Sequence, residues 1–255
     1  MRTTSRVTCR AVAVVLLGAA VLGTATACGT SASSSSATSN AASASARAAG
    51  NPLSGLTADQ VATRTITDLK TVSSVHVTGQ AKDSGQVITF NLIMGRKGCK
   101  GTMGIRGEGS FSLLKIGKTV WIKPDTKFWK YAAGSSLTPA VMQIVVGKYI
   151  KPAGKNSSLG ALGAFCNPGQ FANIFGGPTS GLVKGGTSTI SGQPALQLKD
   201  TGDPAVAYVT LSSRPEFLRM DGGSKGRLDF TRYNAPLRLT RPSARETLDG
   251  AKYGF

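Results

Sequence analysis

The stretch Ile88-Thr-Phe-Asn-Leu-Ile-Met94 decides the fold. Large apolar side chains occupy its first, third, fifth and seventh positions, and in a β-strand these positions point to one face. The same two-residue period returns in short runs before and after this stretch. Such alternation is typical of an antiparallel sheet with one buried face and one solvated face.

Around this stretch the sequence predicts about eleven strands. We expect about six between Val75 and Tyr131 and about five more after residue 195, joined by turns that carry Gly, Asp, Lys and Pro. The block from Leu182 to Ile190 starts the first of the later strands or adds one more. The other runs are marked by Val75 and Val77, Met103 and Ile105, Leu114 and Ile116, Val120 and Ile122, Leu196 and Leu198, Val206 and Tyr208, Leu218 and Met220, Leu228 and Phe230, and Leu237 and Leu239.

Helices are predicted before the first strand and between the two groups of strands. Thr57-Ala-Asp-Gln60 has the spacing of a capping box, and three later helices begin at Thr138-Pro139, Ser157-Ser158 and Asn167-Pro168. A sheet of about eleven strands curls rather than staying flat. The predicted fold class is therefore α+β, a large curved antiparallel β-sheet with helices packed on its concave face.

The first 28 residues resemble the export signal of a bacterial lipoprotein. Three arginines precede a short apolar run, Ala11 to Gly23, and small residues then lead to Cys28 in a sequence similar to a lipobox. The resemblance implies a signal peptide over residues 1–27 and a lipid anchor, with palmitate, on Cys28. The protein would then be extracytoplasmic and anchored to the outer face of the cell membrane. The alternative is an ordinary secretory signal that is cut near Ala27.

Residues 28–54 and 55–255 differ in composition. The first segment is nearly all Ser, Ala, Thr, Gly and Asn, which predicts a flexible linker or a glycosylated stalk. The second is long enough for one domain.

The chain is strongly basic. The full chain has a net charge of +18, and removal of three arginines with residues 1–27 leaves 27 basic and 12 acidic residues, a net charge of +15. Outside the cytoplasm this excess favours anionic lipids or cell-wall polymers over nucleic acid as partners.

Two cysteines remain once the signal is set aside. Cys9 lies within the signal and Cys28 is the predicted lipid site, so Cys99 and Cys166 are left. We expect them to form a disulfide, because an oxidising compartment favours pairing. There is no Cys-x-x-Cys spacing and no neighbouring histidine, so we expect neither a metal nor a cofactor there.

From about Leu56 to Pro242 the chain resembles the actinobacterial LppX/LprAFG-type lipoproteins, which share a half-barrel fold with the LolA and LolB carriers. The resemblance rests on the order of elements behind the lipobox. It also rests on Gly117-Lys-Thr-Val-Trp-Ile-Lys123 followed by Phe128-Trp129, which is similar to a central hairpin, and on Phe230 to Pro242, which is similar to a closing strand. It implies a LolA-like half-barrel that holds acyl chains and moves them between membrane and envelope, in a high-GC Gram-positive bacterium.

Catalytic and metal-binding patterns are weak. The single histidine, His76, lies in a predicted strand, and Gly222-Gly-Ser-Lys-Gly226 matches the G-x-S-x-G pattern but precedes another strand rather than a helix. Asp200 and Asp203 have turn composition, with a calcium site as the alternative. The protein is therefore expected not to be an enzyme. The aromatic residues Trp121, Trp129 and Tyr131 lie among lysines, so they either contact sugars and anionic head groups or pack within the sheet.

The favoured hypothesis is a membrane-anchored lipoprotein that binds a membrane lipid or glycolipid and carries or presents it in the cell envelope. The acyl chains are expected to contact Leu92, Met94, Met103, Met142, Val145, Phe165, Phe171 and Phe175. The alternative is a non-enzymatic envelope scaffold or sensor with a filled core that binds a protein or an anionic polymer. We expect a monomer with no cofactor, no metal and no nucleic acid, and an envelope transporter or sensor protein as its partner.

Overall fold

The computed structural model describes residues 51–255, apart from residues 135–136, 155–156, 176–178 and 254–255. The predicted signal peptide, Cys9 and the lipid site Cys28 lie outside the described residues. Leu53 is fully buried in the main core, and Lys184 Nζ donates to its carbonyl over 2.6 Å. The packed part of the chain therefore reaches back at least to Leu53, which lies in the predicted linker.

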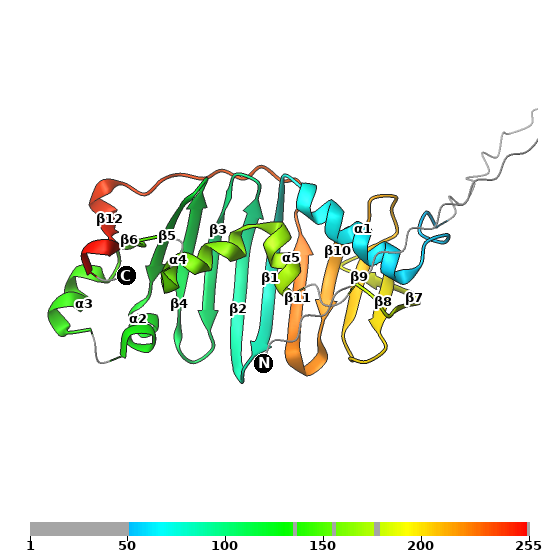
Figure 1. The fold of residues 1–255 in the computed structure, drawn as a ribbon, viewed down its shortest axis with the longest axis horizontal. Coiled ribbons are helices and arrows are strands. Elements are labelled where there is room, and N and C mark those ends of the chain that lie inside the picture. The colour runs from blue at the N-terminus through cyan, green and yellow to red at the C-terminus, as the bar shows by residue number, and fades with distance from the viewer. Residues whose placement is uncertain (1–50, 135–136, 155–156, 176–178, 254–255) are drawn as a thin grey trace, which may run out of the picture. The chain divides into compact units, whose positions relative to one another are not determined.

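Twelve strands of the described chain form one open sheet in the order β12-β6-β5-β4-β3-β2-β1-β11-β10-β9-β8-β7 (Figure 1). The strands are β1 Ser74–Asp83, β2 Gln86–Gly95, β3 Gly98–Ile105, β4 Gly109–Ile116, β5 Thr119–Pro124, β6 Tyr149–Lys151, β7 Leu182–Ile190, β8 Gln193–Asp200, β9 Val206–Thr210, β10 Phe217–Asp221, β11 Gly226–Thr231 and β12 Thr247–Asp249. Neighbours are antiparallel except the short pair β12 and β6. The predicted fold class, α+β with a large curved sheet, is confirmed.

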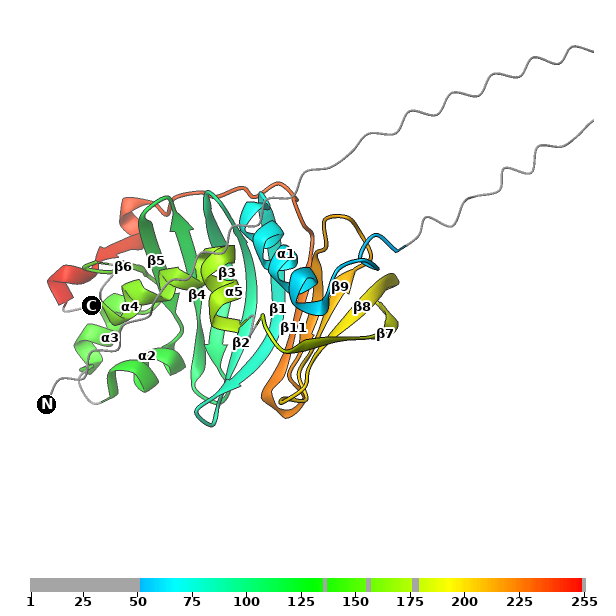
Figure 2. The same cartoon turned by 45° about the vertical axis from the view of Figure 1, so that its right-hand side comes forward.

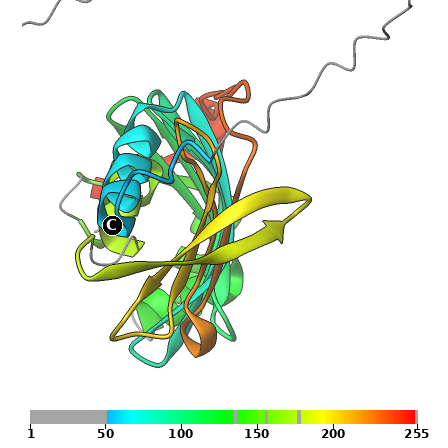
Figure 3. The ribbon, with the colours of Figure 1, turned by 90° about the vertical axis from the view of Figure 1, so that its right-hand side faces the viewer.

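Helices lie on one face of this sheet, as Figures 2 and 3 show for α1 and α5. The helices are α1 Ala58–Thr71, α2 Thr126–Ala133, α3 Pro139–Val145, α4 Ser158–Ala161 and α5 Pro168–Phe175, with short 3-10 turns η2 Leu162–Cys166, η3 Gly223–Lys225, η4 Ala244–Glu246 and η5 Gly250–Tyr253. Thr57 and Gln60 form the predicted capping box, and Thr138 and Ser157 cap α3 and α4. Within the described residues, no helix has the length and apolar character needed to cross a membrane.

Two details of the strand prediction were wrong, and one alternative that it left open is settled. Phe128 and Trp129 lie in helix α2, which begins after Asp125 because the Asp125 carboxylate accepts from Phe128 N over 2.7 Å. The run around Leu237 and Leu239 is extended but pairs with no strand of the sheet. The block Leu182–Ile190 is a separate strand, β7.

The main core contains the side chains predicted by the two-residue period. Phe90, Leu92 and Met94 on β2 are 3%, 0% and 0% exposed, while their neighbour Asn91 is exposed on the other face. The core side chains pack against α1, η2 and α5. Trp129, Val145 and Ile150 form a separate smaller cluster, so α3 covers one end of the sheet rather than its centre.

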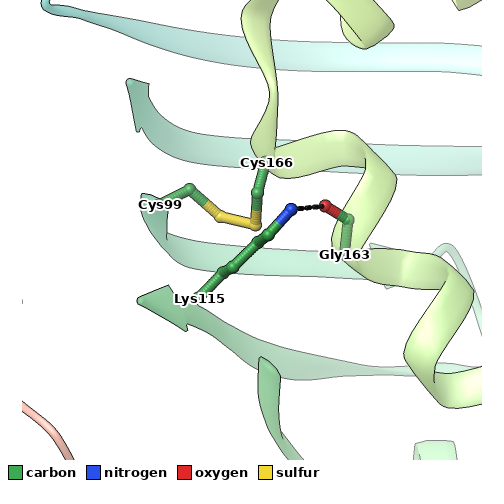
Figure 4. The surroundings of a disulfide bond; sticks show 4 residues. All are labelled: Cys99, Lys115, Gly163 and Cys166. Atoms are coloured by element: carbon green, nitrogen blue, oxygen red, sulfur yellow. Dashed lines mark hydrogen bonds between the residues drawn. A yellow bond between two sulfur atoms is a disulfide. The ribbon is translucent and has the colours of Figure 1, made fainter. Parts of the chain in front are cut away.

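The predicted disulfide between Cys99 on β3 and Cys166 at the end of η2 is present (Figure 4). The two Cα atoms are 5.0 Å apart, and both side chains are buried. Lys115 Nζ donates to the Gly163 carbonyl beside it over 3.2 Å. These two contacts fix η2 to the sheet just before α5 begins.

Replacing both cysteines, Cys99→Ala with Cys166→Ala, should lower the free energy of unfolding by about 4 kcal/mol, because the bond restricts a long loop in the unfolded chain. The loop spans 67 residues. Urea unfolding of the chain from residue 28 onward, made soluble by Cys28→Ser, measures this change against the Cys28→Ser parent. A loss below about 1 kcal/mol would contradict the structural role given to the bond.

Candidate ligand cavity

A cavity of about 610 Å³ lies between the sheet and the helices that cover it. Helix α1 contributes Ala62 and Ile66 to its wall, and η2 and α5 contribute aromatic rings. Strands β1, β2 and β7 to β11 complete the wall. Its apolar side chains include Ala62, Ile66, Ala81, Ile88, Phe165, Ile174, Phe175, Leu182, Leu198, Ala207, Phe217, Met220 and Leu228.

Small inward-facing residues leave this space open. Ala81 on β1 is the register partner of Ile88, and Ala207 on β9 lies between Leu198 and Met220 on the neighbouring strands. All five line the cavity. Farther along the same face, the inward positions carry large side chains such as those of Phe90 and Phe230, which are buried. The space between the sheet and the helices is therefore filled around Phe90 and Phe230 and open around Ala81 and Ala207.

Charged lining residues gather at one end of the cavity, which we call its mouth, near the turns of β1–β2, β8–β9 and β10–β11. These turns lie at the lower ends of the strands in Figure 1. The charged lining residues are Asp83, Asp200, Asp203, Asp221, Lys82, Lys225 and Arg227. Lys225 pairs with Asp203, and Arg227 pairs with Asp221 over 3.0 Å. The hydrogen bond from Lys225 holds the pKa of Asp203 below its ordinary value. Two of the three cations at the mouth are therefore paired already.

Two of the eight predicted ligand-binding residues, Phe165 and Phe175, line the cavity. The structure places the other six elsewhere. Four of them, Leu92, Met94, Met103 and Phe171, are buried in the main core. The remaining two, Met142 and Val145, belong to the small cluster around Trp129. The sequence prediction favoured the largest apolar residues and therefore missed the small residues Ala81 and Ala207. A small side chain at an inward strand position was the signal that could have indicated the open space.

The remaining candidates have structural contacts. The His76 ring lies 2.8 Å from the Asn91 side-chain oxygen on the outer face, and Ser224 lies in the turn η3 between two strands. Asp200 accepts from Gly202 N, while Asp203 pairs with Lys225. No group of three or more His, Cys, Asp or Glu residues that could hold a metal ion occurs in the described part of the chain.

A group of polar residues that includes Arg214 connects the C-terminal end of α1 to the turn between β9 and β10. Arg214 lies 3.7 Å from Asp68 of α1 and also donates to Thr71 Oγ1 over 3.2 Å. Burial raises the pKa of Glu216, the Arg214 charge opposes this rise, and the Asp68 charge adds to it. The next residue, Phe217, lines the cavity. Arg214 thus links the C-terminal end of α1, which covers the cavity, to the turn before β10.

No protein-family model and no curated protein match the sequence. Among solved structures the chain is similar to LprF from Mycobacterium bovis, at 14% identity and a TM-score of 0.47 over 73% of this chain and 97% of that one.

Two further solved structures are similar to the chain. One is a conserved protein from Thermus thermophilus, at 12% identity and a TM-score of 0.34 over 75% of this chain and 98% of that one. The other comes from the MucA/MucB complex of Pseudomonas aeruginosa, at 15% identity and a TM-score of 0.31 over 69% of this chain and 56% of that one.

Glu216→Gln should raise the free energy of unfolding at neutral pH, because the ionised carboxylate is partly desolvated in the folded protein. The folded pKa lies above the ordinary value of 4.5, so the folded protein binds the extra proton first as the pH falls. The advantage of the variant should therefore shrink as the pH falls through the folded pKa toward 4.5. Urea unfolding at several pH values measures it, and an advantage that grows on acidification would contradict the assignment.

Proposed function

We propose that the protein is an extracytoplasmic lipoprotein, anchored through Cys28, that holds a lipid acyl chain in the cavity between α1, α5 and the sheet. The observation that carries this proposal is the apolar cavity of about 610 Å³ with a charged mouth. The export signal and lipobox-like sequence support the location.

The cavity has the size and surface expected for such a ligand. Its volume lies within the range of about 300 to 1,000 Å³ that is usual for pockets that hold small molecules. Each methylene group transferred from water to an apolar wall contributes about 0.8 kcal/mol. The wall offers branched aliphatic side chains, the ring of Phe217 and the adaptable thioether of Met220. Binding would be passive and would tolerate different chains.

The mouth favours particular head groups. Lys225 and Arg227 are paired with aspartates, and Asp83 and Asp200 add further negative charge. A bare phosphate would have to displace an aspartate to reach either paired cation. Hydroxyl or amine groups can instead donate to the carboxylates. At Lys225 and Arg227, a sugar or another neutral or amine-bearing head group is therefore favoured over a bare phosphate.

The scaffold or sensor hypothesis required a filled core. The space between Ala81, Ala207 and the helices is open, and this observation favours the lipid-binding function. Native mass spectrometry of the Cys28→Ser chain from residue 28 onward, followed by organic extraction, tests the proposal. Extra mass that resolves into acyl lipids supports it. A clean protein mass, together with no uptake of a fluorescent fatty-acyl probe, would overturn it.

Ala207→Trp should fill the cavity and weaken binding of a fluorescent fatty-acyl probe at least about tenfold, a loss of about 1.4 kcal/mol. Thr189→Trp is the matched control, because Thr189 lies on β7 and outside the cavity. Probe titration should distinguish the two variants, with circular dichroism to check that both fold. Equal binding by Ala207→Trp and the parent would place the probe elsewhere.

A further inference from the structure

A second hollow of about 440 Å³, which we call the outer groove, lies on the face of the sheet opposite the helices. Asn91 and Ile93 of β2 line it, and they alternate with the inward residues Phe90, Leu92 and Met94. Hydroxyl groups of Thr102, Ser112 and Thr240 also line the groove. The groove therefore offers hydrogen-bonding groups above an apolar floor.

The charged side chains that line the outer groove are both basic. They are Lys100 on β3 and Arg238 in the segment after β11, and no Asp or Glu is among the described lining residues. Two more cations lie beside it. Lys123 is the register partner of Ser112, with its Nζ 5.5 Å from the centre of the Tyr149 ring, and Arg241 follows Thr240.

The segment that carries Arg238 and Arg241 has fixed contacts with the sheet. Figure 1 shows residues 232–246 running in orange and red along the upper ends of the strands toward η4. The Arg241 guanidinium lies 5.7 Å from the centre of the Trp121 ring, which is 4% exposed although it lies on the outer face. Lys148 Nζ donates to the Arg245 carbonyl over 2.8 Å. The Arg241 guanidinium and the backbone at Arg245 are therefore held in place before a ligand binds.

One carboxylate, that of Glu246, lies near the cations beside the outer groove. Ser243 N and Oγ both donate to Glu246 Oε2, over 3.1 and 2.7 Å. These hydrogen bonds hold the pKa of Glu246 below its ordinary value, and the charges of Lys123 and Lys148 contribute. Glu246 is thus engaged at the margin, while Lys100 and Arg238 have no carboxylate among the described residues that line the groove with them.

The positions of exposed apolar residues help to distinguish an anionic lipid surface from a soluble polyanion as the ligand of the outer groove. A face that docks on a lipid surface commonly presents large apolar side chains that enter the membrane interface. The exposed large hydrophobic residues of the described chain are Tyr131, Ile144, Val146, Ile174, Val183 and Tyr253. None of them lines the outer groove. A concave groove with basic and hydroxyl-bearing side chains instead matches an extended chain with repeated negative charges and hydroxyl groups.

We propose that the outer groove is a second binding site, independent of the lipid cavity, for an extended hydroxyl-bearing polyanion such as a phosphodiester-linked polyol. Lys100 and Arg238 pair with successive anionic groups, and the Ser, Thr and Asn side chains hydrogen-bond to the hydroxyl groups between them. Binding weakens as salt rises, because the groove is open to solvent.

The test uses poly(glycerol phosphate) of defined length and the Cys28→Ser chain from residue 28 onward, measured by isothermal titration calorimetry at several salt concentrations. Lys100→Gln with Arg238→Gln should weaken binding at least about tenfold. The matched control, Lys127→Gln with Lys130→Gln, removes the same charge from exposed positions on α2 and should change binding by less than about twofold. Ala207→Trp should bind the polymer normally, which separates this site from the cavity.

Three results would overturn the proposal. Equal losses in the two double variants would show that net charge alone attracts the polymer. Unchanged binding by Lys100→Gln with Arg238→Gln would place the polymer elsewhere. If that variant loses binding to vesicles that contain anionic phosphatidylglycerol but retains polymer binding, the groove is a membrane-docking surface instead.

Discussion

The packing of aromatic rings around Phe90 holds the covering helix to the sheet. The Phe90 ring centre lies 5.2 Å from that of Phe175 and 5.8 Å from that of Phe171, both on α5. Phe171 in turn contacts Phe230 on β11, at 6.3 Å. Such pairs contribute about 0.5 to 1.5 kcal/mol each beyond the area that they bury. Since Phe175 also lines the cavity, the contacts that hold α5 also set the distance between this helix and the sheet at the cavity wall.

Local patterns in the sequence predicted most of the fold. Alternation along β2 placed Leu92 and Met94 in the core, and hydroxyl caps at Thr57 and Thr138 marked helix starts. The sequence could not reveal whether an alternating run finds a neighbouring strand. Leu237 and Leu239 alternate as a strand does, yet their segment lies across the upper strand ends, where Leu239 lies beside Gly98. Pairing depends on the path of the chain and not on the period.

The cavity was less predictable, because its volume is the space that side chains from several helices and strands fail to fill. Sequence reasoning selected the largest apolar residues and so found the core, including Leu92 and Met94, with only Phe165 and Phe175 at the cavity wall. The opening depends on Ala81 and Ala207, whose neighbours in the sheet could be identified only from the register of β1 with β2 and of β9 with β8 and β10. Small residues at inward positions become informative once that register is known.

The same alternation separates the charges of the molecule. On β2, Ile88 faces the cavity while Asn91 and Ile93 face the outer groove, so a single strand contributes to both hollows from opposite sides. At the cavity mouth, aspartates neutralise Lys225 and Arg227, whereas Lys100 and Arg238 have no acidic neighbour among the described residues of the outer groove. The proposed lipid cavity thus has a largely neutralised mouth, while the opposite face of the same basic chain presents positive charge. Because the sheet separates the two proposed sites, occupation of one would leave the other open to solvent.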